Sequence, residues 1–255
     1  MKSPIKIALI QLSSNDKTEE NYEKIKTYLR KSYEKGARFI LTPEVSNFIS
    51  NDIELRRRAL KTEEKDPILR LAKNFALKNH VWILIGSLAV KIDEKINDNY
   101  ANRSLLIDPK GKVVARYDKI HMFDIKINRK VEFKESRYFV PGKKAILVET
   151  CFAKIGMTIC YDLRFPHLFN QLAKAGASLI CVPSAFTIPT GRCHWETLLR
   201  ARALENNVYI LAPAQCGQNE PSRSTWGHSL VIDPTGKIIS DSGKEPGISV
   251  VALTV

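Results

Sequence analysis

One segment of this chain occurs twice. Residues 104–114 read SLLIDPKGKVV, and residues 229–239 read SLVIDPTGKII. Each copy predicts a strand, an Asp-Pro-x-Gly turn and a second strand, because proline presets φ early in such a turn and glycine supplies a positive φ later. A hairpin that recurs in both halves of the chain predicts two sheets of similar construction, related by an internal pseudo-twofold axis.

Strand and helix patterns alternate ahead of each hairpin. Short apolar runs that predict strands cover residues 5–12, 37–41, 81–88, 155–159, 178–182, 209–214 and 248–255. Segments with helical spacing cover residues 17–35, 67–79, 165–175 and 194–206. We expect an α/β fold, a four-layer α-β-β-α sandwich of two mixed sheets with helices outside; a single open doubly wound sheet is the alternative. Because no glycine-rich linker interrupts the chain, residues 1–255 are expected to form a single domain.

The composition favours a globular protein of a reducing compartment. Of the 255 residues 44% are hydrophobic, and no apolar run approaches the ~18–20 residues that span a bilayer. The apolar run at residues 7–10 is too short for a secretory signal. The five cysteines lack a Cys-x-x-Cys spacing, which argues against a disulfide framework and a zinc ribbon. We expect a cytoplasmic protein with reduced thiols and no membrane segment.

The charge balance is strongly basic. The net charge is +13, from 40 Lys and Arg residues against 27 Asp and Glu residues, and such a charge attracts nucleic acid or acidic ligands. The basic residues are dispersed, however, and the densest run, residues 56–58, falls on a predicted helix. The sequence has no RNP-like strand, helix-turn-helix pattern or zinc-finger spacing. We expect a lysine-rich solvated surface and no nucleic-acid partner; a basic binding protein without chemistry is the alternative.

A strand-to-helix corner carries a candidate nucleophile. The apolar run in residues 156–159 ends at Cys160, and a polar turn and a predicted helix follow at once. Such a corner exposes the side chain at its apex, and the first free N–H groups of the helix favour a thiolate or a developing oxyanion. The alternative for Cys160 is a small buried core thiol, the usual place of a free cysteine.

Two further strand ends carry a charged residue. Glu44 follows a predicted buried strand through the rigid turn Thr42-Pro43, and Lys119 lies just after the first repeated hairpin. Burial without a partner moves the pKa of such groups away from the charged form. A glutamate with a raised pKa is a good general base, and a nearby cation stabilises an oxyanion. Taken alone, each residue is better explained as an exposed side chain in a salt bridge, and only its occurrence together with Cys160 favours a catalytic role.

Together these segments resemble the nitrilase superfamily of carbon–nitrogen hydrolases, with its Glu-Lys-Cys triad. The matching segments are Pro43-Glu44, residues 117–124 (YDKIHMFD) and residues 160–166 (CYDLRFP), in that order. Glu135 falls where the family has a second glutamate that orients the lysine and the substrate. The C-terminal half is most similar to the branch of deaminated glutathione amidases, through the stretches PSAF, TGRCHWE, LRARALEN, AQCG and WGHS. His167 departs from the pattern, since an acidic residue is frequent there.

The resemblance implies a thiol amidase. Glu44 would be the general base and Cys160 the nucleophile, while Lys119 and a backbone N–H near Tyr161 would hold the oxyanion. A small ω-amide bearing carboxylates, such as deaminated glutathione, would be hydrolysed through a thioester to acid and ammonia. The resemblance implies no metal or organic cofactor. It does imply a homodimer whose interface includes the C-terminal strand. The further substrate or orientation residues are Arg164, Ser184, Phe186 and Arg192, with Lys126 as another carboxylate reader and Cys216 as a residue that lines the pocket.

Other chemistries share some of these residues. A Cys-His pair is the rival mechanism, although hydrogen bonding in the structure explains each of the five histidines better than general-base chemistry. Within the superfamily, an ω-amidase acting on α-ketoglutaramate or succinamate is the nearest alternative. A true nitrilase would use the same triad.

Overall fold

The chain is folded around two mixed sheets. The computed structural model describes residues 4–95, 99–126, 132–221 and 223–255. In these residues the first sheet has the order β16-β1-β2-β3-β4-β5 and the second the order β15-β14-β11-β10-β9-β8. The strands of the first sheet are β1 (Ile5–Gln11), β2 (Phe39–Leu41), β3 (Trp82–Lys91), β4 (Tyr100–Ile107), β5 (Val113–Asp118) and β16 (Gly247–Leu253). Those of the second are β8 (Ile146–Glu149), β9 (Lys154–Met157), β10 (Leu179–Cys181), β11 (Tyr209–Ala212), β14 (Leu230–Ile232) and β15 (Ile238–Asp241).

The two sheets repeat one topology. In the first, β1, β2 and β3 are parallel, and β4 and β5 continue the sheet antiparallel. In the second, β9, β10 and β11 are parallel, followed by antiparallel β14 and β15. An antiparallel strand completes the other edge of each, β16 beside β1 and β8 beside β9. The internal symmetry predicted from the repeated segment is therefore confirmed.

The repeated turns are built alike. The Asp108 carboxylate accepts hydrogen bonds from the backbone N–H groups of Lys110 and Lys112, as Asp233 does from Thr235 and Lys237. The glycines of the two turns, Gly111 and Gly236, have φ of +72° and +78°. Such values favour glycine, because a Cβ is strained in the left-handed region.

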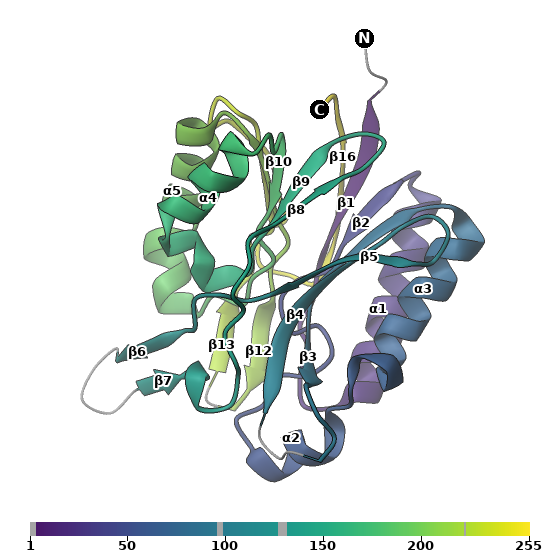
Figure 1. Ribbon diagram of the computed structural model, residues 1–255, viewed down its shortest axis with the longest axis vertical. Coiled ribbons are helices and arrows are strands. Elements are labelled where there is room, and N and C mark those ends of the chain that lie inside the picture. Colours follow the sequence, from purple (N-terminus) through teal and green to yellow (C-terminus); the bar gives the residue numbers. More distant parts are fainter. Residues whose placement is uncertain (1–3, 96–98, 127–131, 222) are drawn as a thin grey trace.

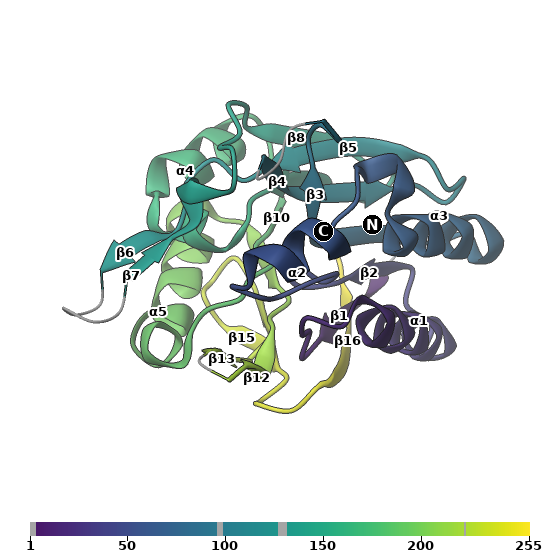
Figure 2. The ribbon, with the colours of Figure 1, turned by 90° about the horizontal axis from the view of Figure 1, so that it is seen from below.

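Helices cover the outer face of each sheet. The helices of the described chain are α1 (Thr18–Glu34), α2 (Ile53–Ala59), α3 (Pro67–Asn79), α4 (Pro166–Lys174) and α5 (Ile188–Asn206). Figures 1 and 2 show α1 and α3 outside the first sheet, and α4 and α5 outside the second. This arrangement is the predicted four-layer sandwich. The described chain also has two small hairpins, β6 (Asp124–Lys126) with β7 (Glu132–Lys134), and β12 (Cys216–Glu220) with β13 (Arg223–Trp226), and 3₁₀ turns at Glu63–Lys65, Glu135–Arg137 and Cys160–Arg164.

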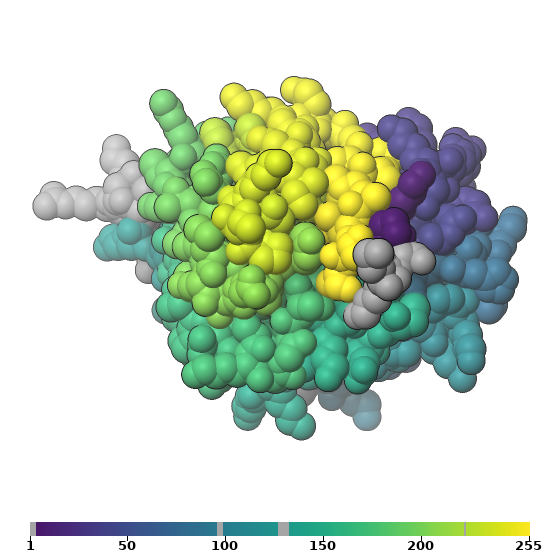
Figure 3. All heavy atoms as spheres, turned by 90° about the horizontal axis from the view of Figure 1, so that it is seen from above, coloured from purple at the N-terminus to yellow at the C-terminus, as the bar shows by residue number. Residues whose placement is uncertain are grey.

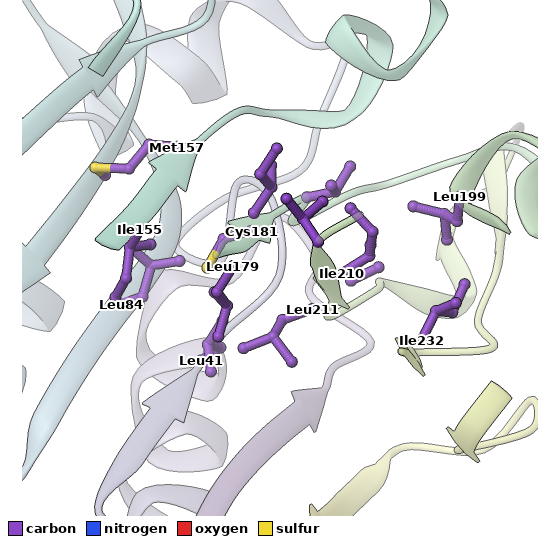
Figure 4. Packing of buried hydrophobic residues seen from close by; sticks show 14 of the residues in the cluster. Leu41, Leu84, Ile155, Met157, Leu179, Cys181, Leu199, Ile210, Leu211 and Ile232 are labelled. Carbon is purple, nitrogen blue, oxygen red and sulfur yellow. The ribbon is translucent and has the colours of Figure 1, made fainter. Parts of the chain in front are cut away.

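The alternation of side chains in the strands explains the layers. Leu41 and Leu84 of the first sheet share a buried cluster with Leu179 and Cys181 of the second, while Ile210 of the second sheet lies toward Leu199 of α5 (Figure 4). A separate cluster of Ala8, Ile10 and Ile40 with residues of α1 and α3 fills the outer side of the first sheet. Since successive residues of a strand point to opposite faces, both faces of each sheet are apolar and covered.

Among the helices, one boundary differs clearly from the sequence prediction. Helix α5 begins at Ile188, six residues before the predicted start at His194. The polar turn predicted after Cys160 is a 3₁₀ turn, and α4 begins at Pro166, close to the predicted start at residue 165. The C-terminal strand β16 joins the first sheet beside β1, so the two ends of the described chain lie side by side (Figures 1 and 3). The sequence carries no local signal for that pairing.

Candidate active site

The predicted site residues meet at one end of the two sheets. Glu44 follows β2, Lys119 follows β5, and Cys160 begins the 3₁₀ turn after β9. Glu135 begins another 3₁₀ turn after β7. All four line a cavity of about 430 Å³. Parallel strands end at the same edge of a sheet, so residues far apart in the sequence are brought together there.

The Lys119 ammonium joins two carboxylates. Its Nζ lies 3.0 Å from Glu44 Oε1 and 2.8 Å from Glu135 Oε2, and its side chain is only 2% exposed. Asn102 Nδ2 donates to the same two groups, at 2.9 Å to Glu44 and 3.1 Å to Glu135. An ammonium has three N–H donors, and the two carboxylates use two. Among the described residues, one donor of Lys119 therefore remains for a ligand.

The backbone fixes the position of Cys160. Its φ is +48°, an uncommon value for a residue other than glycine and one that is found at functional sites. The Cys160 N–H donates to the Pro183 carbonyl at 2.9 Å. Its thiol donates to the Glu44 carboxylate and receives the Ala185 N–H. No described residue accepts the N–H of Tyr161, which follows directly.

Electrostatics in the cavity favour a charged glutamate and a neutral thiol. Burial alone would raise the pKa of Glu44, but the Lys119 charge and hydrogen bonds from Cys160, Lys119 and Asn102 outweigh it, so the pKa lies below its ordinary value. Burial and the Glu44 charge hold the pKa of Cys160 well above its ordinary value. Burial opposes the charge on Lys119, but Glu135 and Glu44 raise its pKa well above normal.

These directions correct two expectations. The pKa of Glu44 is lowered rather than raised, because the carboxylate is paired with Lys119. Cys160 holds its proton rather than being a thiolate, because burial and the negative charge of Glu44 both raise its pKa. The Glu44 carboxylate and the Cys160 thiol are thus arranged for a proton to move from the sulfur to Glu44 when the sulfur attacks.

A buried aspartate joins the lysine segment to the cysteine turn. Asp162 Oδ2 accepts hydrogen bonds from Tyr117 Oη at 2.7 Å and from the Ile159 N–H at 2.9 Å. Asp162 Oδ1 accepts the His121 N–H at 3.0 Å and lies 2.7 Å from His121 Nδ1. Tyr117 and His121 flank Lys119, and Ile159 precedes Cys160. Asp162 therefore sets the position of the ammonium relative to the sulfur.

Comparison with known proteins places the chain in a family. Residues 6–255 match the carbon-nitrogen hydrolase family. The chain belongs to this family. It is 38% identical to the deaminated glutathione amidase of Dictyostelium discoideum and 40% identical to that of Yersinia enterocolitica, in each case over 92% of this chain and 82% of the relative. The crystal structure of the C. elegans NitFhit protein superimposes with a TM-score of 0.93 at 34% identity, over 99% of this chain and 61% of that one.

The match confirms the resemblance to the nitrilase superfamily and its deaminated glutathione amidase branch. The chain is thus a hydrolase of carbon–nitrogen bonds other than peptide bonds. In its described part, no helix combines the length and apolar character needed to cross a membrane. No group of three His, Cys, Asp or Glu side chains in the same part is arranged to hold a metal ion.

The other residues proposed for this carbon–nitrogen hydrolase divide into two groups. Tyr161 and Phe186 line the cavity with the triad. The residues of the second group are not among those that line it in the described chain. They are Arg164, whose Nη2 lies 2.9 Å from His194 Nδ1, Ser184, which donates to the Val182 carbonyl, exposed Arg192 and Lys126, and Cys216, which is buried in β12.

Several cavity residues were missed by sequence reasoning. Asn102 lies in β4, Tyr138 follows the 3₁₀ turn that holds Glu135, and Arg223 begins β13. Each is a single polar or aromatic residue whose neighbours form no motif, so only the tertiary fold shows its place. Among the described residues no histidine lines the cavity. The partner of Cys160 is thus a carboxylate, unlike in the Cys-His alternative.

Proposed function

We propose that this protein is a thiol amidase that uses Glu44, Lys119 and Cys160 to hydrolyse a small carboxylate-bearing amide, with deaminated glutathione as the first candidate. The observation that carries the proposal is the meeting of a thiol, a carboxylate and an ammonium in one cavity, with the thiol hydrogen-bonded to the carboxylate. The names of the two amidase relatives support the substrate.

The first half-reaction forms a thioester. Cys160 Sγ attacks the amide carbon while its proton passes to Glu44, with which it already shares a hydrogen bond. The carbonyl oxygen becomes an oxyanion, and the remaining Lys119 N–H and the Tyr161 N–H are placed to receive it. The C–N bond then breaks, and Glu44 returns the proton to the departing nitrogen. Loss of one oxyanion donor typically costs roughly 10²–10³ in turnover.

The second half-reaction releases the acid. Glu44, again a carboxylate, takes a proton from a water molecule that attacks the thioester carbon. The C–S bond breaks, and the proton on Glu44 returns to the sulfur. Because Glu44 takes up one proton and gives it back in each half-reaction, a carboxylate held in its charged form suits both steps.

Glu135 acts by position. Its Oε2 accepts the Lys119 ammonium at 2.8 Å and the Phe123 N–H at 2.7 Å, while Oε1 accepts from Asn102. These contacts hold the carboxylate in one orientation, and Lys119 with it. We propose that Glu135 orients the lysine and the amide nitrogen of the substrate without exchanging a proton.

We also propose a cytoplasmic homodimer in which residues 1–255 act as one domain. The two sheets share a core and a cavity, which supports the single domain. All five cysteines, each in the described part, are free, as thiols are in a reducing compartment. Strand β16 is an edge strand in the described sheet, and such edges are commonly covered by a partner. Light scattering of the purified protein tests the dimer.

The decisive experiment follows the carboxylic acid product from a panel of amides. The panel contains deaminated glutathione, α-ketoglutaramate, succinamate and the nitrile that corresponds to succinamate. We expect turnover of amides in the wild type, none in Cys160→Ala, and the highest kcat/KM for deaminated glutathione. Preference for α-ketoglutaramate would identify an ω-amidase and preference for the nitrile a nitrilase. Amide turnover retained by Cys160→Ala would contradict the mechanism.

A further inference from the structure

The cavity carries more positive than negative charge. The side chains that line it include five cations, Arg56, Lys119, Lys134, Arg137 and Arg223, and two carboxylates, Glu44 and Glu135. Both carboxylates already pair with Lys119. The described lining thus contains more cations than carboxylates, which favours an anionic ligand.

The hydrogen bonding of the Arg223 guanidinium is incomplete within the described residues. Arg56 lies over the Tyr138 ring at 4.5 Å and donates to the Ser50 carbonyl at 2.7 Å, and Arg137 also lies over that ring. Lys134 is exposed. The buried Nε of Arg223 has no hydrogen-bond partner among the described residues, and Nη2 makes only a long contact of 3.5 Å with the Ala185 carbonyl. A buried guanidinium N–H without an acceptor is unfavourable, so this group lacks a ligand.

The position of Arg223 relates it directly to the nucleophile. Ala185 donates its N–H to the Cys160 sulfur and directs its carbonyl at Arg223 Nη2. One residue of backbone thus separates the sulfur from the guanidinium. A substrate can place its amide carbon at Cys160 and another of its groups at Arg223. In that case only a few bonds can separate that group from the amide carbon.

The strand that carries Arg223 is held rigidly. Trp226 of β13 packs so closely on α5 that a Cβ at Gly191 would come within 2.3 Å of its ring, and the Trp226 N–H donates to the Phe186 carbonyl at 2.9 Å. Thr225 donates to Asn219 at 2.7 Å, and Asn219 donates to the Ser14 carbonyl at 2.9 Å. The backbone on either side of this contact is therefore fixed, which limits the positions that the Arg223 side chain can take.

We propose that Arg223 binds the carboxylate of the amide substrate and so selects amides that carry a carboxylate a few bonds from the scissile carbonyl. The fork of guanidinium donors matches two carboxylate oxygens. The proposal rests on the amidase function above and assigns a specificity-determining residue to it. It replaces Arg164, Arg192 and Lys126, which the sequence suggested for this role.

The test compares two amides that differ in one charge. Succinamate and its methyl ester have the same amide and chain, but only the first carries a carboxylate. We expect Arg223→Met to lower kcat/KM for succinamate by about 10- to 100-fold, mainly through KM, and to change it less than threefold for the ester. Arg223→Lys should lie between, because lysine keeps the charge but not the fork. Arg30→Met, an exposed arginine on α1, is the matched control and should change neither substrate.

A second measurement does not depend on turnover. Butanedioate should protect Cys160 from iodoacetamide in the wild type and in Arg30→Met, but not in Arg223→Met, while the unprotected alkylation rate stays the same in all three. That equal rate reports an intact site in Arg223→Met. If the wild type hydrolysed no amide, the proposed function would fail, yet loss of protection in Arg223→Met would still support carboxylate binding. Equal losses for succinamate and its ester, unchanged protection in Arg223→Met, or discrimination caused by Arg192→Met would overturn the assignment.

Discussion

The two halves of the molecule have the same frame but different chemistry. Each contains three parallel strands, an Asp-Pro-x-Gly hairpin and an outer pair of helices. Even the helix ends correspond, since α3 and α5 both end in a left-handed residue, His80 and Asn207. The loops at the carboxyl ends of the strands differ. The first half supplies Glu44, Asn102 and Lys119, and the second half supplies the sulfur.

The difference teaches that the repeat determines the frame and leaves the site to the loops. The turn after β2 runs Thr42-Pro43-Glu44, and the corresponding turn after β10 runs Val182-Pro183-Ser184. Glu44 reaches Lys119 in the cavity, whereas Ser184 donates to the Val182 carbonyl and is fully buried. Equivalent turns thus hold an acid in one half and a structural hydroxyl in the other. Substitutions in the symmetric parts of the fold should change the free energy of unfolding, and substitutions in the asymmetric loops should change turnover.

The largest effect is expected where the second half contributes its one reacting atom. Cys160→Ala removes the nucleophile, and loss of a nucleophile that acts within a catalytic unit costs roughly 10⁴–10⁶ in kcat. The change is measured by acid release at saturating amide. Cys193→Ala is the control, since that thiol is exposed on α5, and it should keep wild-type turnover. If Cys193→Ala lost activity as severely, the sulfur of the second half would be wrongly identified.

The next effect comes from the first half. Glu44→Gln keeps the size of the side chain but removes the base and one partner of Lys119, so we expect kcat to fall by about 10²–10⁴. Glu64→Gln makes the same change at an exposed position and should be silent. Normal acid release by Glu44→Gln would move the base to another residue.

The pH dependence of kcat/KM reports the protonation states of Glu44, from the first half, and Cys160, from the second. Glu44 has a pKa below its ordinary value of 4.5, and Cys160 has one well above 9.0. The active form has Glu44 charged and the thiol protonated, so kcat/KM for an uncharged amide should be flat from roughly pH 5 to 9. A limb near the ordinary histidine value of about 6.5 would instead indicate a Cys-His pair.

The same shifts predict where folding stability changes. Since the pKa of Glu44 is lowered in the folded protein, its contribution is present above pH 4.5 and is lost as the pH falls through the folded value. Since the pKa of Lys119 is raised, its contribution is present below pH 10.5 and is lost as the pH rises through the folded value. The free energy of unfolding in urea, measured as a function of pH, should therefore differ between the wild type and Lys119→Met from pH 4.5 to pH 10.5. The two values should approach each other only outside that range.

The sequence predicted the frame more completely than the site. Alternating apolar runs and the repeated turn were enough for the sheets, because they depend on local pattern and burial. The first turn of α5 was missed because it contains Pro189 and Gly191, two residue types that are typical of turns rather than helices. Glycine is required at position 191 because Trp226 approaches it closely. Asn102 and Arg223 were missed because each reaches the cavity through long-range pairing. The protonation of Cys160 and Glu44 depended on a contact between the halves, which no single segment shows.

The smallest effects should come from the symmetric turns. Alanine at Gly111 or Gly236 places a Cβ at positive φ, which costs about 1–2 kcal/mol of unfolding free energy. At Gly111 the new atom would also lie 2.7 Å from the Lys73 carbonyl oxygen, which belongs to backbone and cannot rotate away. At Gly236 it would lie 2.8 Å from Leu204 Cγ, a side chain that can adjust. We therefore expect Gly111→Ala to be the more destabilising of the two.

Gly243→Ala isolates the backbone contribution, because its φ is +64° and nothing lies within 4 Å of the added Cβ. Urea unfolding should rank the three variants Gly111, Gly236 and Gly243 from the largest loss to the smallest. Turnover should stay within about twofold, because both hairpin turns lie at the opposite sheet edge from the cavity and a destabilised but folded enzyme keeps its site. A turn variant that lost catalysis before it lost stability would break the division between a symmetric frame and asymmetric loops.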